Sequence, residues 1–266
     1  MKKLLGCLLL LVSIPMVLMV GCGSRYTGPA GPGPGTPTPG LTGTATPGVY
    51  TTPQTTLQAA VNLGSAANYV VLSYTGISNS GPSTTCGGYG VYPDGQTSVT
   101  GSPAIVETCG GAIDVGDGTA DTAKINLSAA YTDASTRSGG ASLPAGGDVG
   151  GQTLYPGLYN CGGNLNIAQA NLTLNGNGNM NSIFIFQVTN NLIIGPGRQI
   201  VLTNSAQAAN VFWAVAGYCS LDTTDIMVGN IMAYTSVTLN TGAMLVGRAL
   251  AENGDVTLLT NNITHP

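Results

Sequence analysis

Side chains that could act as catalytic acids or bases are few in this sequence of 266 residues. The nearest approach to a catalytic carboxylate pair is Asp222 with Asp225, for which Arg248 is a possible basic partner; the single histidine, His265, lies next to the C-terminus. A polysaccharide-cleaving enzyme needs acids or bases that converge in one groove, and no lysine or histidine accompanies this pair. Turn and capping roles explain both aspartates more simply, so we predict no catalytic residue and no enzymatic activity.

The stretch DVGDG, residues 114–118, has the acidic spacing found at the start of some calcium loops. It lacks the later bidentate glutamate of such a loop and the glycine pattern of nonapeptide calcium repeats. The stretch also comes directly before a segment with helical periodicity. We therefore interpret it as the turn into that helix, and we predict no metal site and no cofactor.

The charge balance argues against nucleic acid as a partner. The chain has 11 acidic residues, 7 Lys+Arg, 40 glycines and a formal net charge of −4. Binding to phosphates requires several basic side chains on one face, and the sequence has no basic cluster. The surface must therefore be covered mainly by threonine, serine, asparagine, glutamine and glycine.

The first 22 residues are typical of an export signal. Lys2 and Lys3 precede an apolar run that ends in LMVGC, and the segment is too short and too one-sided for a stable membrane span. The ending resembles the lipobox of bacterial lipoproteins, in which the cysteine after a small residue is lipidated and becomes the mature N-terminus. This resemblance implies a lipid on Cys22, attachment to a lipid bilayer, and an exported protein held at the bacterial cell envelope or surface.

Residues 23–57 are rich in proline, glycine and threonine and have no apolar periodicity. Such a segment cannot bury enough apolar surface to offset the entropy lost on ordering. We predict a disordered tether here, followed by one folded domain over residues 58–266.

A repeat runs through the second half of this domain. Tyr159, Phe186 and Trp213 lie 27 positions apart in similar phrases, GLYNC, FIFQV and VFWAV. Repeats of this length, made of short alternating strands and separated by Gly, Asn or Asp turns, favour a β-solenoid, in which equivalent side chains stack inside. Later units are shorter, and their equivalent leucines lie 18 and 19 positions apart: Leu221, Leu239 and Leu258.

One segment has helical rather than strand periodicity. Residues 117–137 carry apolar side chains at i, i+4, i+7, i+8 and i+11. We expect Thr119 to cap the start of this helix and Gly139 with Gly140 to end it. The stripe suits packing along one side of a β-helix. Its members are Ala123, Leu127, Ala130, Tyr131 and Ala134.

Four cysteines lie outside the N-terminal segment, in a chain whose export permits disulfides. Three pairings are possible among them. Cys161 and Cys219 occupy different columns of the repeat and are two rungs apart in a sequential stack, roughly 9 to 10 Å, which is too far for a bridge. We therefore predict a disulfide between Cys86 and Cys109, with Cys161 and Cys219 acting as small buried apolar residues.

From about residue 63 to residue 263 the chain resembles a known family. The phrases that carry the resemblance follow one another in order: LGSAANYVVLSYTGISNSGPS, GVYP, INLSAAYTDA, GGQTLYPGLY, LTLNGNG, SIFIFQV, AQAANVFWAVAG, VGNIMAYTSVTLNTGAMLVGRALA and VTLLTNNIT. Together they are similar to the ice-binding protein family that carries the domain of unknown function DUF3494.

The resemblance implies an all-β-dominated fold, a right-handed parallel β-helix of triangular cross-section with one long α-helix packed alongside. The N-terminal coil is expected to stack against the C-terminal end, so that the order of the rungs is discontinuous. Some members carry a capping insertion before the helix, which would fall within residues 81–116 here.

Ice-active members bind ice through one flat β-face, often with a T-A/G-x-T/N pattern. The aligned repeats place this pattern on residues 168–171, 196–199, 223–226 and 241–244. A stiff face of this kind presents methyl and hydroxyl groups at a regular repeat near that of ice. The candidate ice-binding residues are Ala168, Asn171, Thr223, Thr224 and Thr241.

The pattern is incomplete in this chain. Arg198 and Asp225 would bring hydrated charges into the face, and Ile226 and Met244 replace its terminal hydroxyl. Threonine also favours exposed strand positions for reasons unrelated to ice. The predicted function is non-catalytic binding to ice or another regular surface; the alternative is a surface adhesion or interaction module on the same scaffold. The sequence does not indicate an oligomeric state.

Overall fold

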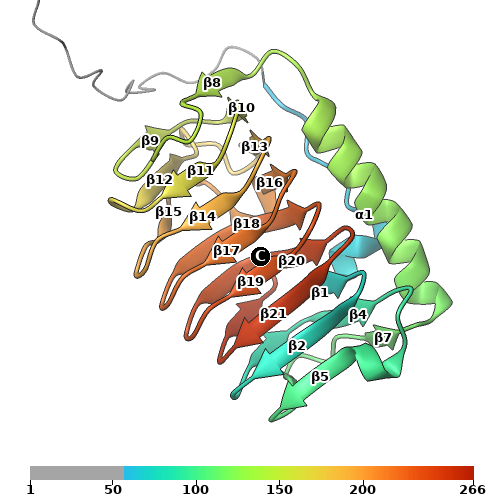
Figure 1. The fold of residues 1–266 in the computed structure, drawn as a ribbon. Helices are drawn as coiled ribbons and strands as arrows, with labels where there is room; N and C mark the ends of the chain where they lie inside the picture. The colour runs from blue at the N-terminus through green and yellow to red at the C-terminus, as the bar shows by residue number, and fades with distance from the viewer. Residues whose placement is uncertain (1–56) are drawn as a thin grey trace, which may run out of the picture. The chain divides into compact units, whose positions relative to one another are not determined.

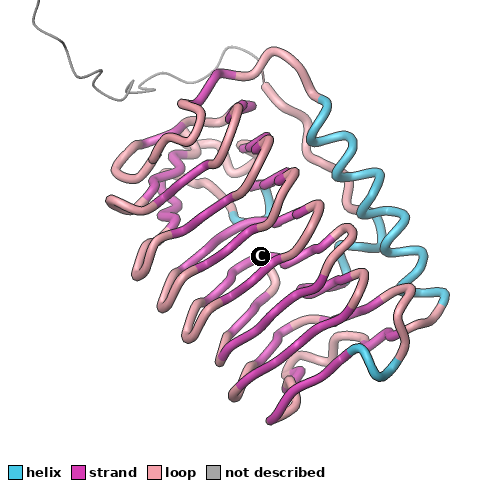
Figure 2. Tube along the Cα trace, viewed as in Figure 1, coloured by secondary structure: helices cyan, strands magenta, loops and turns pink. Residues whose placement is uncertain are grey.

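The computed structural model describes residues 57–266. The predicted export signal with Cys22, and residues 23–56 of the predicted tether, lie outside the described residues. In the described part the chain winds into stacked coils whose strands pair in parallel, and one long helix lies along the stack (Figure 1, Figure 2). The predicted fold class, a parallel β-helix with one helix, is confirmed.

Each coil contributes strands to three sides, which we name A, B and C. Side A contains β8 (Ala141–Leu143), β10 (Gly157–Cys161), β13 (Phe184–Val188), β16 (Val211–Val215), the second halves of β18 (Ile226–Ala233) and β20 (Met244–Ala251), β1 (Tyr69–Ser73), β4 (Gly88–Val91) and β7 (Ile113–Val115). Side B contains β11 (Leu165–Ile167), β14 (Leu192–Ile194), β17 (Cys219–Leu221), β19 (Val237–Leu239), β21 (Asp255–Leu259), β2 (Gly76–Ser80) and β5 (Val99–Ser102). Side C contains β9 (Thr153–Leu154), β12 (Leu172–Asn175), β15 (Ile200–Thr203), the first halves of β18 and β20, β22 (Asn262–Thr264), β3 (Thr84–Cys86) and β6 (Val106–Glu107).

Two long strands, β18 and β20, cross from side C to side A without a break. Gly229 and Gly247 are paired at the crossing and both have positive φ, 102° and 159°. A Cβ atom on Gly247 would lie 1.9 Å from the Gly229 carbonyl oxygen. Only glycine therefore lets the two backbones approach this closely while they turn.

The order of the coils does not follow the sequence. On side A, β1 pairs with β20, and on side B, β2 pairs with β21, so the first coil of the domain stacks against the last (Figure 1). This discontinuity, expected from the family resemblance, is confirmed. Residues 81–116, predicted as a cap, contain β3, β4, the short helix η2 (Gln96–Ser98), β5, β6 and β7, and these strands extend all three sides at one end of the stack.

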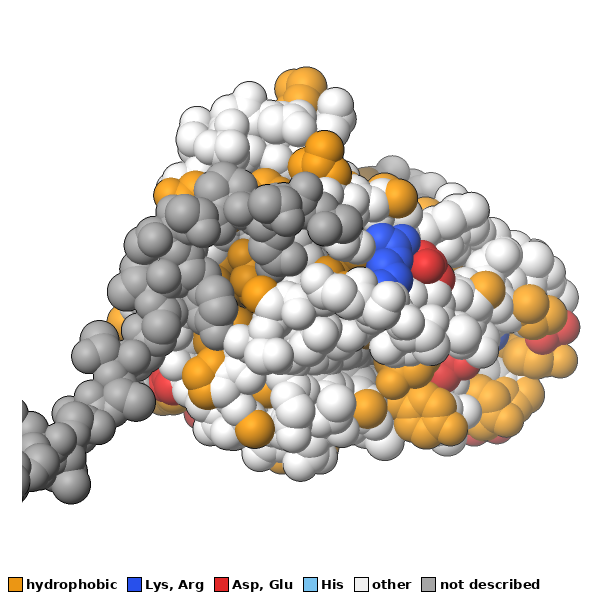
Figure 3. All heavy atoms as spheres, turned by 90° about the horizontal axis from the view of Figure 1, so that it is seen from above, with side chains coloured by type: hydrophobic (Ala, Val, Ile, Leu, Met, Phe, Trp, Pro, Cys, Tyr) orange, Lys and Arg blue, Asp and Glu red, His pale blue; other side chains and the backbone are white. Residues whose placement is uncertain are grey.

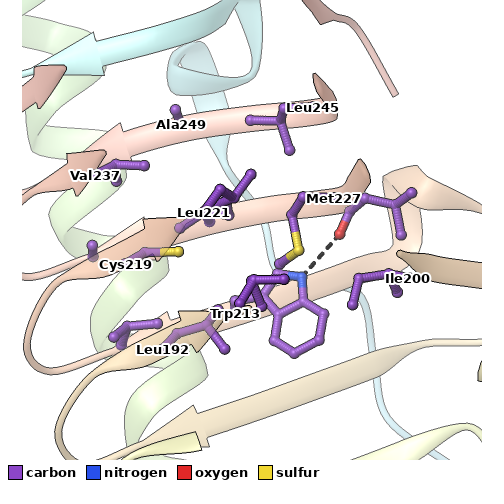
Figure 4. Packing of buried hydrophobic residues seen from close by; sticks show 14 of the residues in the cluster. Leu192, Ile200, Trp213, Cys219, Leu221, Met227, Val237, Leu245 and Ala249 are labelled. Atoms are coloured by element: carbon purple, nitrogen blue, oxygen red, sulfur yellow. Dashed lines mark hydrogen bonds between the residues drawn. The ribbon is translucent and has the colours of Figure 1, made fainter. Parts of the chain in front are cut away.

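The repeat predicted from the aromatic spacing forms the centre of the core. Tyr159, Phe186 and Trp213 are paired in register on β10, β13 and β16, and their rings stack with centroids 5.2 and 4.0 Å apart. The Trp213 indole donates its Nε1–H to the Val228 carbonyl at 3.0 Å, so its one polar atom is satisfied (Figure 4). Leu221, Leu239 and Leu258 also share a column, as predicted.

Helix α1 (Gly118–Thr136) covers side A. Its N-cap is Asp117, whose side chain accepts hydrogen bonds from the Thr119 and Ala120 N–H groups; the prediction of Thr119 as the cap was wrong by two residues. Lys124 is buried on the inner face, and its Nζ donates to the carbonyls of Ala251 and Glu252. Two further 3-10 turns, η1 (Gly64–Asn68) and η3 (Ala208–Asn210), join strands. Between residues 57 and 266 no helix is both long and apolar enough to cross a bilayer.

The predicted covalent state of the cysteines is confirmed. Cys86 and Cys109 form a disulfide with their Cα atoms 4.8 Å apart, and Cys161 and Cys219 are free and buried. Cys161 pairs with Val188 on side A, whereas Cys219 pairs with Leu192 on side B. The two free thiols therefore belong to different columns, as the repeat indicated.

Candidate functional site

Side A cannot serve as an open flat surface, because α1 packs against its outer apolar residues. Leu158, Ile185, Phe212 and Leu250 are buried in one cluster with the inner face of the helix. Sides B and C remain, and the side B strands β11, β14, β17 and β19 alternate between buried and partly exposed residues. Figure 3 shows one face of the molecule, on which charged side chains are sparse and most of the surface is white, that is, uncharged polar side chains and backbone.

Side B presents a continuous column of outward residues at the centre of its strands. Strand pairing places these residues in register from one coil to the next. The column contains hydroxyl side chains in five successive strands, at the inter-strand spacing of about 4.8 Å that a β-sheet imposes. In order the residues are Asn166, Ile193, Ser220, Thr238, Thr257, Ser78 and Thr100.

Side B carries almost no charge. Asp255, at the start of β21, is the one ionisable carboxylate or basic side chain within its seven strands. Its Oδ2 accepts a hydrogen bond from the Thr257 hydroxyl at 2.9 Å, and the Thr257 hydroxyl lies 3.1 Å from that of Ser78. These bonds link three neighbouring side chains, so the hydroxyl groups are held in place before anything binds.

The residues predicted from the T-A/G-x-T/N pattern lie beside this column, in the turns that lead from side B to side C. Thr223 and Thr224 follow β17, Thr241 follows β19, and Ala168 with Asn171 spans the turn after β11; all five are exposed. Backbone hydrogen bonds join these turns from coil to coil, for example from Thr224 N–H to the Thr241 carbonyl at 3.2 Å. The predicted residues therefore form one corner row, and the strands beside it supply the hydroxyl column.

Asn171 has a structural partner in this row. Its Oδ1 accepts a hydrogen bond from the Gln199 N–H at 3.0 Å, which ties one corner turn to the next.

The expectation that Asp225 charges the exposed face was wrong. Asp225 is fully buried in the corner turn, where its carboxylate accepts hydrogen bonds from the N–H groups of Asp222 at 2.6 Å and Arg198 at 2.9 Å. Burial raises the pKa of Asp225 to about 6, although these backbone donors oppose the rise. Arg198 itself is partly exposed and lies along the corner, donating from Nε to the Ala168 carbonyl at 2.8 Å.

Ile226 and Met244 do not interrupt the hydroxyl column either. Both begin long strands on side C, where they are paired in register with each other. Side C is more apolar on its outer surface than side B, since Met244, Val246 and Val106 are all exposed there. The two positions at which the sequence pattern lacks its terminal hydroxyl therefore lie on side C and not on side B.

Comparison with known proteins agrees with this architecture. A family model described as Ice-binding-like matches residues 71–264. The chain belongs to the Ice-binding-like family. An "Ice-binding protein" of Flavobacterium frigoris (strain PS1) is 36% identical over 215 residues, which cover 77% of this chain and 76% of that protein. An "Ice-binding protein" of Colwellia sp is 33% identical over 222 residues, covering 78% and 84%.

Solved structures show the same fold as this Ice-binding-like chain. The crystal structure of an ice binding protein from an Antarctic Biological Consortium is similar with a TM-score of 0.75 and 34% identity, covering 80% of this chain and 95% of that one. The DUF3494 domain of Shewanella frigidimarina ice-binding protein 1 has a TM-score of 0.72 and 26% identity, covering 79% and 99%.

This Ice-binding-like fold keeps Asp222 and Asp225 in one turn but does not bring Arg248 to them. The Asp225 carboxylate is occupied by the turn backbone, while Arg248 lies on side A, where it donates to Asn230 Oδ1 at 2.6 Å and to the Ala67 carbonyl. His265 lies beside Arg248, with its Nδ1 3.2 Å from a guanidinium nitrogen. Within residues 57–266 no three His, Cys, Asp or Glu side chains are grouped as metal ligands would be.

Sequence reasoning missed the strand column of the Ice-binding-like domain. The signal was present in the repeat phrases SVTLN and DVTLL, in which Thr238 and Thr257 stand between two apolar residues. In an alternating strand such a residue faces outward. Ser78 and Thr100 gave no such signal, because their strands join the column only through the stacking of the first coils on the last.

Proposed function

We propose that this protein binds ice through the outer surface of side B and the corner row beside it, and that it does so without catalysis. One observation carries the proposal: five hydroxyl side chains, on five successive strands, lie in register on a side that carries no lysine or arginine. Family membership and relatives that are themselves called ice-binding proteins support it.

The geometry explains how weak contacts can add up. Each threonine offers a methyl group that orders neighbouring water and a hydroxyl that can take a lattice position in that water. Outward residues recur at about 4.8 Å between strands and roughly 6.6 Å along a strand, which makes a two-dimensional array. Adsorption of such an array to a growing ice surface blocks further growth where the protein sits.

Rigidity is the second requirement, because ordering the surface at the moment of binding would cancel the gain from weak contacts. The backbone of side B is hydrogen-bonded on both edges of its inner strands, and the core behind it is packed with buried leucine, isoleucine and valine. The internal bonds of Thr257 with Ser78 and Asp255 hold the hydroxyl groups themselves. The array therefore needs little further ordering to bind.

Localisation forms part of the same proposal. Lipid on Cys22 would hold the domain at the cell envelope through the tether of residues 23–57, so that the protein acts on ice at the cell surface. Replacing Cys22 with serine is expected to release the protein from the membrane fraction and to leave thermal unfolding of the domain unchanged. Retention of the Cys22→Ser protein in membranes would contradict lipid anchoring.

Ice-recrystallisation inhibition tests the main function directly. The soluble Cys22→Ser protein is added to a sucrose solution of fine ice crystals, and the growth of mean crystal size is followed against an equal mass of a protein without ice activity. We expect crystal growth to stop at low protein concentration. Growth at the control rate, with the folded state verified by circular dichroism, would contradict ice binding and favour an adhesion role.

A further inference from the structure

Asp225 connects two successive corner turns although it faces away from the surface. Its Oδ2 accepts from the Asp222 N–H within its own turn, at 2.6 Å, and its Oδ1 accepts from the Arg198 N–H of the preceding coil, at 2.9 Å. The side chain is fully buried. One carboxylate therefore sets the position of one turn relative to the next.

The turns that Asp225 joins carry the exposed corner row. Gly197 N–H donates to the Thr223 carbonyl at 3.0 Å, and Thr224 N–H donates to the Thr241 carbonyl at 3.2 Å. Thr224 has a positive φ of 62°, a conformation that threonine rarely adopts unless its surroundings impose it. A displacement at Asp225 would therefore move Thr223 and Thr224 relative to Thr241.

Asn261 occupies the equivalent corner position two coils further on and shows why an amide would not replace Asp225. Its Oδ1 accepts from the Leu259 N–H, while its Nδ2 donates to the carbonyls of Asn240 and Ala243, both at 2.9 Å. That position offers acceptors to an amide nitrogen. Both bonds to Asp225 come from donors, so an amide there would turn its NH₂ group against a backbone N–H.

We propose that the Asp225 carboxylate is a positioning residue of the ice-binding surface, which holds the turns of residues 195–199 and 222–226 in the register that adsorption to ice requires. The inference rests on the proposed function, because it assigns the corner row a part in ice binding. The effect of Asp225 on the position of the turns can also be measured without ice.

The two turns can be observed while the Asp225 carboxylate is titrated. Burial raises the pKa of Asp225 to about 6; the backbone donors of Arg198, Asp222 and Gly197 lower this pKa, and the Asp222 carboxylate raises it. The titratable groups that face Asp225 are the Asp222 carboxylate and the buried Cys219 thiol, whereas the Arg198 guanidinium points to the Ala168 carbonyl. Protonation converts one acceptor oxygen into a donor, so mild acid should disturb the turns as an amide does.

Protonation of Asp225 in mild acid should stabilise the folded state while it disturbs the positions of the two turns. Because the folded pKa of Asp225 lies above its ordinary value of 3.8, protonation of this group favours the folded state as the pH falls from about 6 toward 4. Unfolding at this site therefore cannot explain a loss of ice activity in the same range. If Asp225 only stabilised the fold, acidification would not lower ice activity while protonation of Asp225 favours the folded state.

The experiment compares the full chain with its Asp225→Asn variant above and below pH 6. In the unsubstituted protein we expect the amide signals of Arg198 and Asp222 to titrate together in ¹⁵N-edited NMR, and recrystallisation inhibition to weaken several-fold on acidification while its melting temperature rises relative to that of Asp225→Asn. Asp225→Asn should show the weaker activity at both pH values, with no such titration. Asp121→Asn, which removes a carboxylate from α1, should behave as the unsubstituted protein does.

Two results would overturn the inference. One is a folded Asp225→Asn variant with full ice activity; the other is a pair of amide signals that do not respond to pH around 6. If the unsubstituted protein shows no ice activity at any pH, the proposed function fails. In that case a shared titration of the two amides would still establish that Asp225 positions the turns, and its absence would refute that as well.

Discussion

Thr238 and Thr257 lie side by side on the outer surface of side B, paired in register on the neighbouring strands β19 and β21. The Thr257 hydroxyl lies 3.1 Å from that of Ser78, a residue 179 positions earlier in the chain. The hydroxyl column therefore runs without interruption across the point where the first coil stacks against the last. A surface assembled in this way has the regularity that ice binding requires, although the sequence that produces it is not continuous.

Thr238→Tyr should remove most of the recrystallisation inhibition, because a bulky ring at the centre of the column keeps ice-like water away from the neighbouring strands. The free energy of unfolding should change by only about 0.5 kcal/mol, since the side chain points outward. The matched control is Thr173→Tyr, because Thr173 is an outward residue of β12 on side C. This variant should retain activity. Equal loss in both variants, or in neither, would show that side B is not the binding surface.

Arg198→Thr should increase ice activity. The guanidinium group is strongly hydrated and lies at the corner row, where its water shell competes with an ice-like layer. Loss of its hydrogen bond to the Ala168 carbonyl should cost about 1 kcal/mol of stability. The concentration that halts recrystallisation measures the effect, with Arg137→Thr, at the residue that follows α1, as a control of equal charge change. Activity at or below that of the unsubstituted protein would argue against a role for the corner.

Replacing both Cys86 and Cys109 with alanine should lower the free energy of unfolding by about 2 to 4 kcal/mol, because the disulfide restricts the unfolded chain. Urea denaturation measures the change. Cys219→Ala, which removes a buried free thiol, should cost clearly less, since no cross-link is lost. A double variant as stable as the unsubstituted protein would show that the bridge does not contribute to the fold.

Lys124 should make stability depend on pH in the alkaline range. Burial lowers its pKa from 10.5 to about 8, so between these values the unfolded chain holds a proton that the folded chain has released. Stability therefore rises with pH through this window by the contribution of this group. Urea denaturation at several pH values should show the unsubstituted protein gaining on Lys124→Met as the pH rises. A constant difference between the two would contradict the buried position of this amine.

Several features of the fold follow from the sequence alone. The equal spacing of Tyr159, Phe186 and Trp213 predicted that they share one column, and the structure pairs them in register. Likewise, the column difference between Cys161 and Cys219 left Cys86 and Cys109 as the bridge that the structure contains. Such inferences succeed because a stacked coil must present the same kind of side chain to the core at each turn of the chain.

The direction of the corner side chains was decided only by the tertiary structure. Asp222 and Asp225 are three positions apart in one turn, yet Asp222 is partly exposed and Asp225 is fully buried. Alternation does not extend through a turn, because its residues leave the strand conformation, and the hydrogen bonds available from the neighbouring coil then determine which side chain points inward. The sequence therefore identified the repeating strands and their buried faces. The stacking of coils that are distant in sequence determined which hydroxyl groups share one flat side. The same stacking determined which carboxylate is buried in the corner beside that side.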